Sequence, residues 1–463
     1  MSGTFSSINT ALSAIRYNQV ALDLASNNIA NANTDGYVRR RLVAGSVGGP
    51  TTPAMWSKYD GHGDGVRVVA SQRMVDVLLD GRVRREHGTL SYLQTTQTVL
   101  KRLDDAIAEP SDNGVAAALQ EFRSSWHDLA NNPGGDAARQ QVLGRAATLV
   151  QAIHSQLSNV TGEEADQRVH MLSLVSDVSS AAGDLAALNQ TILSSKANGN
   201  DVADLEDQRD QLALRLSELA GAVTTVRPDG MYDVTVGGQS LVSGNTASSL
   251  TIASGITATG DSDGTPLTLA VTGPSGTTPV TGLGGEVGAV SDLLTTVLPG
   301  YRAGLDAVAK DLADTVNAQH AAGYDASGAA GGDFFSYDPA DPAASLAVAI
   351  TDTSKIAAAS VAGTVDGNNA DALSQTGNVE SAYQRLVNSF GVEVSTLNSR
   401  TTNQQALAGS VDESREQQAG VNLDEETVNL MTAQRAYQAA ARVMSTIDEV
   451  LDTLINRTGL VGR

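Results

Sequence analysis

The sequence predicts a mainly α-helical protein with a small inserted β module, nested discontinuous domains, terminal coiled-coil helices and a long-helix rod domain. Apolar residues recur at alternating steps of three and four near both ends, and the same period returns in two internal stretches. A period of two dominates residues 222–283. Because a helix places residues three and four apart on one face and a strand alternates faces, the chain order is terminal helix, rod, β module, rod, terminal helix.

This order predicts three domains, two of which are built by pairing an early segment with a late one. Residues 1–40 and 420–463 form a terminal coiled-coil assembly domain, and residues 41–221 and 284–419 form a helical rod domain. Residues 222–283 form an outer β module. A chain of 463 residues is long enough for this number of domains.

Composition excludes several classes of function. The formal net charge of −22 disfavours a nucleic-acid partner. The charge is uneven, since residues 1–103 hold 12 Lys and Arg against 7 Asp and Glu, which makes them +5 and the remainder −27. The chain has no cysteine, so disulfides and thiolate metal sites are excluded. It shows no long uninterrupted apolar run and no basic, then apolar N-terminus, so neither membrane insertion nor a Sec signal peptide is expected.

The C-terminal segment predicts one long helix. Asn422 is a good N-cap with Glu425 three residues later, as in a capping box, and acidic residues fill the first turn. The apolar positions that follow form a heptad seam. Its large members are Leu430, Tyr437, Met444, Ile447, Leu451 and Leu454, with Ala433 and Ala440 between them.

The N-terminal segment carries a matching seam on a helix with few charges. Its large members are Phe5, Ile8, Leu12, Ile15, Leu22 and Ile29, with Gln19 and Ser26 between them. A neutral polar outer face suits packing against further copies of the chain. The twelve large seam residues bury too little apolar surface to offset the entropy of ordering both ends, and Asn, Ser and Thr are mediocre helix formers. We therefore expect both ends to be largely disordered in the free subunit and to fold on assembly.

The first half of the rod is expected to contain long helices. Residues 38–72 are Gly-rich and are interpreted as an irregular connector, with one short alternating strand near Val66. Helical periodicity begins near residue 73 and is clearest over 115–129, where Asn-Pro-Gly stops it. A third helical pattern continues through 142–192, and a fourth opens near residue 204.

The β module and the returning rod follow in order. Asp-Gly and Gly-Gly bracket residues 231–236, which predicts hairpins there, and further strands fit 249–253 and 266–271. Helical spacing returns from residue 286. A small β excursion is expected over 331–350, and a long helix over 379–418.

Two motifs flank these domains and resemble the axial proteins of bacterial flagella, which comprise the rod, hook and hook-associated families. The first contains Asn28, Ala30, Asn31, Thr34, Gly36 and Tyr37. The second contains Asn422, Leu423, Gln434, Arg435 and Tyr437 within a longer run that ends near Arg457. The second motif resembles in particular the family of flagellar hook-associated protein 1.

The resemblance implies a structural subunit, secreted to the extracellular flagellum, that forms the junction between hook and filament by helical self-assembly. The large seam residues of both ends would then form the assembly interface. It implies partners as well: further copies in a ring-like assembly, the flagellar hook protein and a second junction protein, hook-associated protein 3. It also implies type III export with a small export chaperone on the C-terminal helix.

Other functions remain open at the level of sequence. A different axial protein, hook or rod, would share the first motif but lack the helical segment 73–221. A secreted coiled-coil adhesin or binding module would use residues 222–283 as its ligand-binding head. An enzyme is disfavoured: the glycines at 282, 284 and 288 suit a loop entering a helix better than a dinucleotide site. The six histidines show no metal-ligand spacing. We therefore expect no catalytic, cofactor or metal residues.

Overall fold

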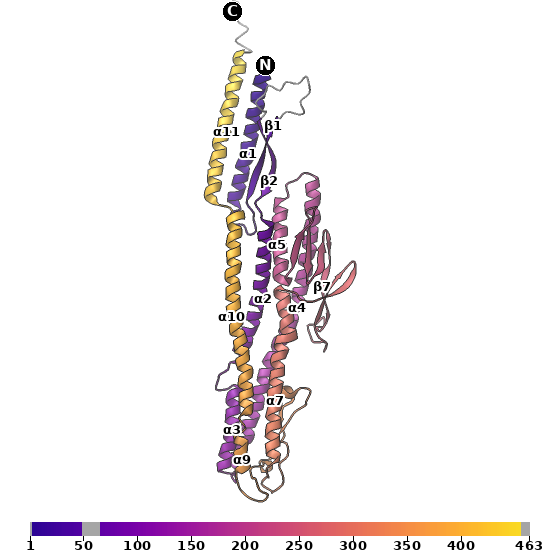
Figure 1. The fold of residues 1–463 in the computed structure, drawn as a ribbon, viewed down its shortest axis with the longest axis vertical. Coiled ribbons are helices and arrows are strands. Elements are labelled where there is room, and N and C mark those ends of the chain that lie inside the picture. The colour runs from indigo at the N-terminus through magenta and orange to yellow at the C-terminus, as the bar shows by residue number, and fades with distance from the viewer. Residues whose placement is uncertain (1, 49–64, 455–463) are drawn as a thin grey trace, which may run out of the picture.

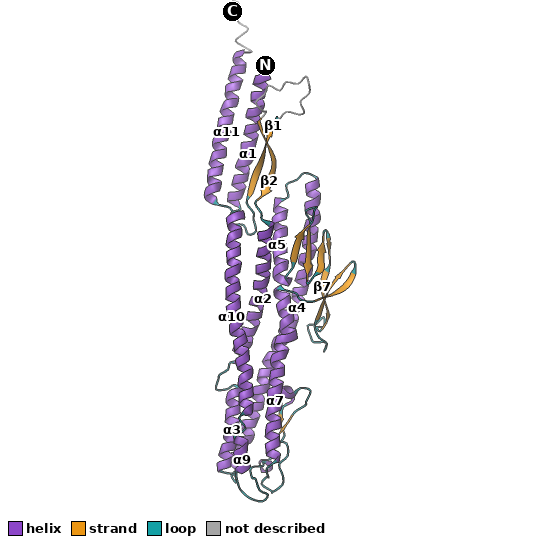
Figure 2. Cartoon of the chain, in the orientation of Figure 1, coloured by secondary structure: helices purple, strands orange, loops and turns teal. Residues whose placement is uncertain are grey.

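A computed structural model describes residues 2–48 and 65–454, with the side chains of residues 2–6 left out. The molecule is a long rod in which most helices run along the long axis and both ends of the chain lie at the same end (Figure 1). Helices dominate, and strands occupy a hairpin beside the N-terminal helix and a module on one flank (Figure 2). The predicted fold class, mainly α with a small β component, is confirmed.

The terminal region pairs the first helix with the last. Helix α1 (Ser2–Ala30) packs along α11 (Leu423–Asp452) at one end of the rod (Figure 1). Strands β1 (Arg40–Val47) and β2 (Gly65–Arg73) form an antiparallel hairpin that lies against α1. The short strand predicted near Val66 is confirmed as part of β2, whereas the prediction of an irregular connector is wrong for β1 and for the pairing of the two strands. The pairing was missed because the Gly-rich composition hid two extended stretches that pair only with each other.

The far half of the rod is a helical bundle around one apolar core. Its helices are α2 (Val77–Ile107), α3 (Val115–Asn131), the first half of α4 (Asp136–Ala197), α7 (Leu298–Ala321) and α10 (Asn378–Ala419). The predicted helix over 115–129, its stop at Asn-Pro-Gly and the long helix over 379–418 are confirmed. Aromatic rings of Phe122, Trp126 and Phe334 pack together with centroids 5.4–6.1 Å apart.

A second apolar core joins the β module to the rod. The second half of α4 packs with α5 (Ala203–Ala220) and α6 (Gly285–Asp292) on one side and with the strands on the other. Helix α4 is long and apolar enough, by length and composition alone, to cross a membrane. Its buried apolar residues instead belong to both cores, so α4 runs through both parts of the rod and connects them.

The β module contains two small antiparallel sheets. Strands β3 (Val223–Val226), β4 (Tyr232–Val236), β5 (Gln239–Ser243) and β6 (Thr246–Ala247) follow one another in one sheet. Strands β7 (Ser249–Ser254), β8 (Thr268–Gly273) and β9 (Gly276–Val280) form the other. The predicted hairpins around residues 231–236 are confirmed. Strand β9 was missed because Pro and Thr weaken its apolar alternation.

Between α6 and α10 the chain makes short elements at the far end. A π-helical stretch (Leu293–Val297) joins α6 to α7 just before Pro299, which lacks the N–H that a regular helix needs. Strands β10 (Phe335–Ser336) and β11 (Ala347–Val348) pair, which confirms the small β excursion. The remaining elements are α8 (Pro342–Ser345), the 3₁₀ helix Thr353–Lys355 and α9 (Asn368–Ser374).

Candidate assembly interface and its polar joint

Asn28 lies at the centre of the place where the terminal helices meet the rod. It is 1% exposed in the last turn of α1. Its amide nitrogen donates to the backbone oxygen of Arg40 at 3.0 Å and to the Glu426 carboxylate at 3.1 Å. Its amide oxygen accepts from the Tyr37 hydroxyl at 2.8 Å and from the Arg40 backbone N–H at 3.2 Å. One side chain therefore fastens α1 to β1 and to α11.

The other residues of the first motif shape the turn that leads from α1 into β1. The Thr34 hydroxyl donates to the Asn31 side chain at 3.2 Å, and the Tyr37 N–H donates to the Thr34 carbonyl at 3.1 Å. Gly36 has φ +77°, and a Cβ there would lie 2.0 Å from the side chain of Gln211 on α5. Glycine is thus required both for the backbone and for the close approach of α5. Ala30 is exposed in the last turn of α1.

Arg39 connects the same turn to the start of α11. Its guanidinium contacts Glu426 at 2.7 Å and Glu425 at 2.8 Å, and Glu426 is 3% exposed. The Asn422 side chain accepts from the N–H groups of Asp424 and Glu425, which confirms the predicted N-cap. Glu425 pairs with Arg39, although a capping box would turn it back to the Asn422 backbone. The acidic first turn of α11 is therefore a docking point for the hairpin.

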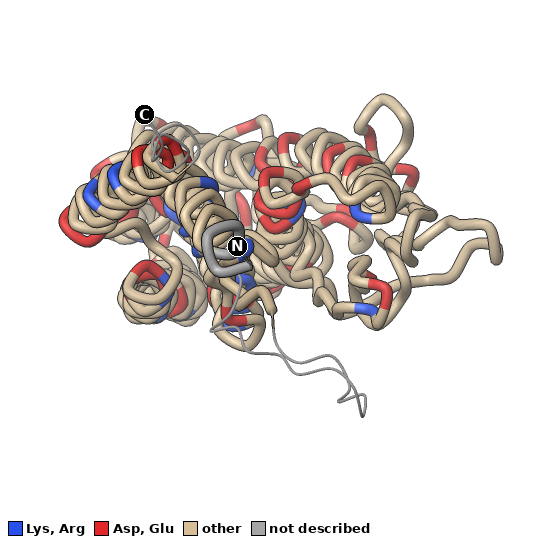
Figure 3. Tube along the Cα trace, turned by 90° about the horizontal axis from the view of Figure 1, so that it is seen from above, with Lys and Arg blue, Asp and Glu red and all other residues tan. Residues whose placement is uncertain are grey.

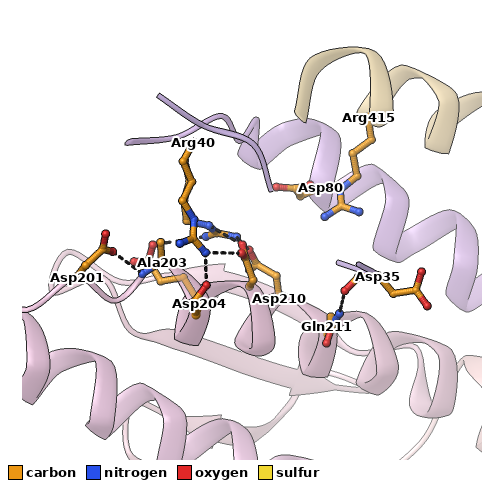
Figure 4. A network of polar contacts seen from close by, with 12 residues as sticks. Asp35, Arg40, Asp80, Asp201, Ala203, Asp204, Asp210, Gln211 and Arg415 are labelled. Carbon is orange, nitrogen blue, oxygen red and sulfur yellow. Dashed lines mark hydrogen bonds and ion pairs between the residues drawn. The ribbon is translucent and has the colours of Figure 1, made fainter. Parts of the chain in front are cut away.

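A row of carboxylates on α5 receives two more arginines from the hairpin. Arg40 pairs with Asp204 and, at 3.2 Å, with Asp207; Arg73 contacts Asp207 and Asp210, each at 2.6 Å (Figure 4). Burial lowers the pKa of Arg73, but the carboxylates of Asp210 and Asp207 outweigh it, so the net pKa lies above the ordinary value. Arg73, Asp207 and Asp210 are largely buried, so removal of Arg73 would leave the Asp210 carboxylate without this ion pair in a largely buried site.

Below this row, Arg415 and His87 hold neighbouring helices together through three further contacts. Arg415 on α10 contacts Asp80 on α2 at 3.0 Å (Figure 4). His87 on α2 lies 2.9 Å from Asp412 on α10 and 3.5 Å from Glu218 on α5. The hydrogen bond to Glu218 and that to Asp412 raise the pKa of His87 to about 9, against the effect of burial. A protonated His87 therefore ties three helices together.

The predicted seam residues lie along the helix pair, but the pair buries few of them. Ala433 and Ala440 are buried on α11, whereas Leu430, Met444, Ile447 and Leu451 are half-buried. On α1 the half-buried positions are Ile8, Ile15, Leu22 and Ile29. The buried residues between them are Ala11 and Ala25, one position before the predicted Leu12 and Ser26. The apolar residues that are buried on the two terminal helices are therefore small ones.

Several predicted interface residues are left exposed by the helix pair. Leu12 is 36% exposed, Tyr437 36% and Leu454 52%. The side chain of Phe5 lies outside the described residues. In the second motif, Asn422, Leu423, Gln434 and Arg435 are exposed, and only Asn422 has a clear local role as a cap. Exposure is what a surface for neighbouring copies requires, so these positions stay candidates for assembly contacts.

The contacts of Asn28, Arg39, Arg40 and Arg73 with α11 and α5 together form the polar joint. Sequence reasoning missed the charged half of this joint. Arg39, Arg40 and Arg73 looked like a local basic excess, and the acidic start of α5 looked like an ordinary helix N-terminus. The signal was present, because Asp204, Asp207 and Asp210 recur every three residues on one helical face. Their partners are more than 130 residues away in the chain, which local patterns cannot connect.

The motifs considered for ligands have structural roles or no cluster around them. Gly284 is the N-cap of α6, and Gly285 approaches the backbone of α5. Within residues 2–48 and 65–454, no group of three or more His, Cys, Asp or Glu side chains is placed to hold a metal ion. Of the Gly-rich turn at 61–65, all but Gly65 lies outside the described residues.

Comparison with known families places the chain among flagellar proteins. Residues 100–335 match the model described as flagellar hook-associated protein FlgK helical domain. Residues 8–37 match the model of the flagella basal body rod protein, and residues 415–457 that of the flagellar basal body rod FlgEFG protein C-terminal. The two shorter matches coincide with the paired ends, and the long one with the rod and β module.

Relatives that align over the whole chain are flagellar proteins too. The chain is 28% identical to flagellar hook-associated protein 1 of Bacillus subtilis, over 100% of both chains. It is 27% identical to the protein of that name from Escherichia coli, over 97% of this chain and 99% of the relative. The fold is similar to that of the flagellar hook junction protein FlgK from Burkholderia pseudomallei, with a TM-score of 0.64, 19% identity and coverage of 73% of this chain and 99% of that one.

Proposed function

Because the chain belongs to the FlgK family of flagellar hook-associated proteins and is therefore a structural protein of the bacterial flagellum, we propose that its copies join hook to filament by packing their terminal helices into a common wall. The terminal helices would form the inner layer, and the rod and β module the outer layers. The polar joint would hold the two layers at a fixed angle.

One observation carries this proposal: the terminal pair leaves an apolar surface uncovered. Val428, Val443 and Val450 on α11 are 48–57% exposed, and Val20 on α1 is 40% exposed. A stable monomer rarely exposes so many apolar side chains along one element, and such surfaces mark sites of association. Neighbouring copies would cover them, as in a coiled-coil layer.

The partners follow from the family and from this surface. We assign the assembly interface to the predicted seam residues of α1 and α11, including Leu12, Tyr437 and Leu454, which the pair leaves exposed. Further copies would bind laterally, with the hook protein below and hook-associated protein 3 above. An export chaperone would cover α11 before assembly, and the assembled protein would be extracellular.

The alternatives have less support. The match to the FlgK helical domain over residues 100–335 favours a hook-associated protein over a hook or rod protein. Within the described residues, which include all of the β module, no group of three or more His, Asp or Glu side chains is placed to hold a metal ion for a ligand-binding head. The relatives are structural proteins of the flagellum, and the proposal assigns no catalytic activity to this one.

The test is made in the organism that carries the gene. Deletion of the gene should give cells with hooks but without attached filaments, and the wild-type gene should restore swimming. Ile15→Asp and Leu430→Asp should not restore it, whereas Val361→Asp, on an exposed loop at the far end, should. Filaments that stay attached to hooks after deletion would contradict the proposed function.

A further inference from the structure

A groove lies between the start of α2 and the edge of the β module, below the polar joint. It has a volume of about 780 Å³. One wall is α2 from Val77 to Tyr92, and the other is β3 with the end of α5. Its lining includes Gly88, Gly221 and Gly284. A Cβ at Gly88 would lie 2.7 Å from the Ser217 carbonyl oxygen and one at Gly221 would lie 2.6 Å from Gly284, so these glycines let the backbones approach closely.

The rim of this α2–β3 groove is unusually apolar and exposed. Leu78 is 86% exposed, Val77 57%, Val223 61% and Val226 48%. Strand β3 is an edge strand, since it pairs only with β4 in its sheet. Exposed apolar residues beside an open strand edge favour association and are normally covered. We therefore expect this groove to be covered when the protein is assembled.

Charge narrows the identity of the occupant. Arg82 and Arg85 are exposed on the same stretch of α2, and Arg84 and Arg85 line the groove. Beyond residue 103 the chain has a net charge of −27, and Asp and Glu are spread over the helices of the rod (Figure 3). A basic, apolar groove on an acidic protein is complementary to another part of the same protein.

The matching surface is the elbow where α10 passes into α11, residues 413–431. Leu423, Val428 and Met431 are 44–57% exposed there. Acidic side chains surround them: Glu413, Glu416 and Asp424 are exposed. The elbow thus combines exposed apolar side chains, which match the apolar rim of the groove, with acidic side chains, which complement its arginines.

The two surfaces lie at one level but on different sides. Arg415 of the elbow pairs with Asp80, in the first turn of α2, which sets the elbow level with the upper end of the groove. Helix α2 packs against α10 on one side and against α5 on the other. Figure 1 shows α10 and α11 along one edge of the rod and the β module along the opposite edge.

We infer that the α2–β3 groove binds the α10–α11 elbow of a second copy of this chain. Two different surfaces at one level give a head-to-tail contact, which repeats around an axis into a ring or a shallow helix. The inference rests on the proposed function, because it names the lateral contact within that assembly. It adds an outer contact to the inner layer of terminal helices.

Cysteine cross-linking tests this contact directly, because the natural chain contains no cysteine. Leu78→Cys and Leu423→Cys are introduced into separate genes that are expressed together, and isolated flagella are oxidised with copper phenanthroline. The pair should give at least ten times more cross-linked dimer than Leu78→Cys combined with Val361→Cys. Leu78→Cys alone should give no dimer above that control, since the contact joins unlike surfaces.

A charge reversal gives a second, independent readout. Arg82→Glu should lower the yield of the Leu78–Leu423 cross-link several-fold, and adding Asp424→Arg should restore it. A yield equal to the control pair, or equal dimer from Leu78→Cys alone, would overturn the inference. These results leave the proposed function intact if the protein is still labelled between hook and filament by antibody; its absence from that place would refute the proposed function itself.

Discussion

Replacing Asn28 by Ala should release the terminal helices from the rod without unfolding the rod. Asn28 is buried and makes four hydrogen bonds, to Tyr37, Glu426 and both backbone polar groups of Arg40. The substitution removes every one of them and leaves space beside Glu426, which is 3% exposed. No contact of Asn28 reaches the bundle core.

The expected magnitude follows from the partners left behind. A buried polar group without a partner costs about 1–3 kcal/mol. Glu426 keeps its contact with Arg39, whereas the half-buried Tyr37 hydroxyl and the Arg40 backbone groups lose a partner, so we expect a total of about 2–4 kcal/mol. At about 1.4 kcal/mol per factor of ten, local opening should become roughly 30 to 1000 times more frequent.

Hydrogen exchange of the dilute, full-length protein measures this opening. In the wild type we expect a gradient: residues 25–40 and 422–430, at the joint, exchange slowly, whereas residues 8–20 and 440–452 exchange fast because only alanines are buried between them. This gradient refines the expectation that both ends are disordered in the free subunit. In Asn28→Ala the slow part should become fast, and α3 should be unchanged.

The matched control is Asn18→Ala on the same helix. Asn18 is half-buried and its side chain donates to the Ala14 carbonyl one turn earlier. It should change exchange at the joint by less than about 1 kcal/mol. Equal loss of protection in α3, or unchanged exchange in α11 of Asn28→Ala, would refute the view that Asn28 couples the terminal pair to the rod.

Three further predictions follow from single contacts. The pKa of His87 is about 9 when folded against 6.5 ordinarily, so its contribution to stability is complete below pH 6.5 and lost as the pH rises through 9. Because solvent screens this half-buried group, denaturant unfolding should show a loss of only about 1–2 kcal/mol, absent in His87→Gln but present in His127→Gln. Gly36→Ala should destabilise the joint by about 1–3 kcal/mol in hydrogen exchange, because alanine is strained at a φ of +77° and its Cβ would displace the Gln211 side chain. Its control is Gly144→Ala, in open space on α4, which should stabilise the protein by about 0.5–1 kcal/mol. Leu149→Ala, fully buried in the bundle, should lower the unfolding free energy of the rod by about 2–5 kcal/mol in calorimetry and leave exchange at the joint unaltered.

Most helices could be predicted because their signals are local. The helix over 115–131 has apolar residues on one face and an Asn-Pro-Gly stop, and the last helix has a capping Asn422. The hairpin of β1 and β2 could not be predicted, since its strands pair across a separation of more than 15 residues and rest on α1. The same reason hid the ion pairs between this hairpin and α5.

The sequence predicted the heptad spacing of the seam residues but not how far each of them is buried. Counting apolar residues at heptad spacing selected Leu12 and Tyr437, yet the apolar residues that are buried on these helices are alanines. The large residues of the seams stay half-buried or exposed. A pattern of apolar residues identifies the contact face of a helix, but it does not say whether one neighbour or several will cover that face.

The polar joint explains why the apolar seam of α1 ends in a motif of Asn, Thr, Gly and Tyr. Alanine contacts along α1 and α11 fix neither the register nor the angle of the pair, since one small residue packs much like another. The four directional bonds of Asn28, together with Arg39 on Glu426, define one register at one end. An assembly subunit needs this combination: a surface that many neighbours can share, attached to its rod at a single geometry. We therefore interpret the motif as the fixed point that orients the terminal helices, while under the proposed function the exposed apolar flanks would supply the contacts between copies.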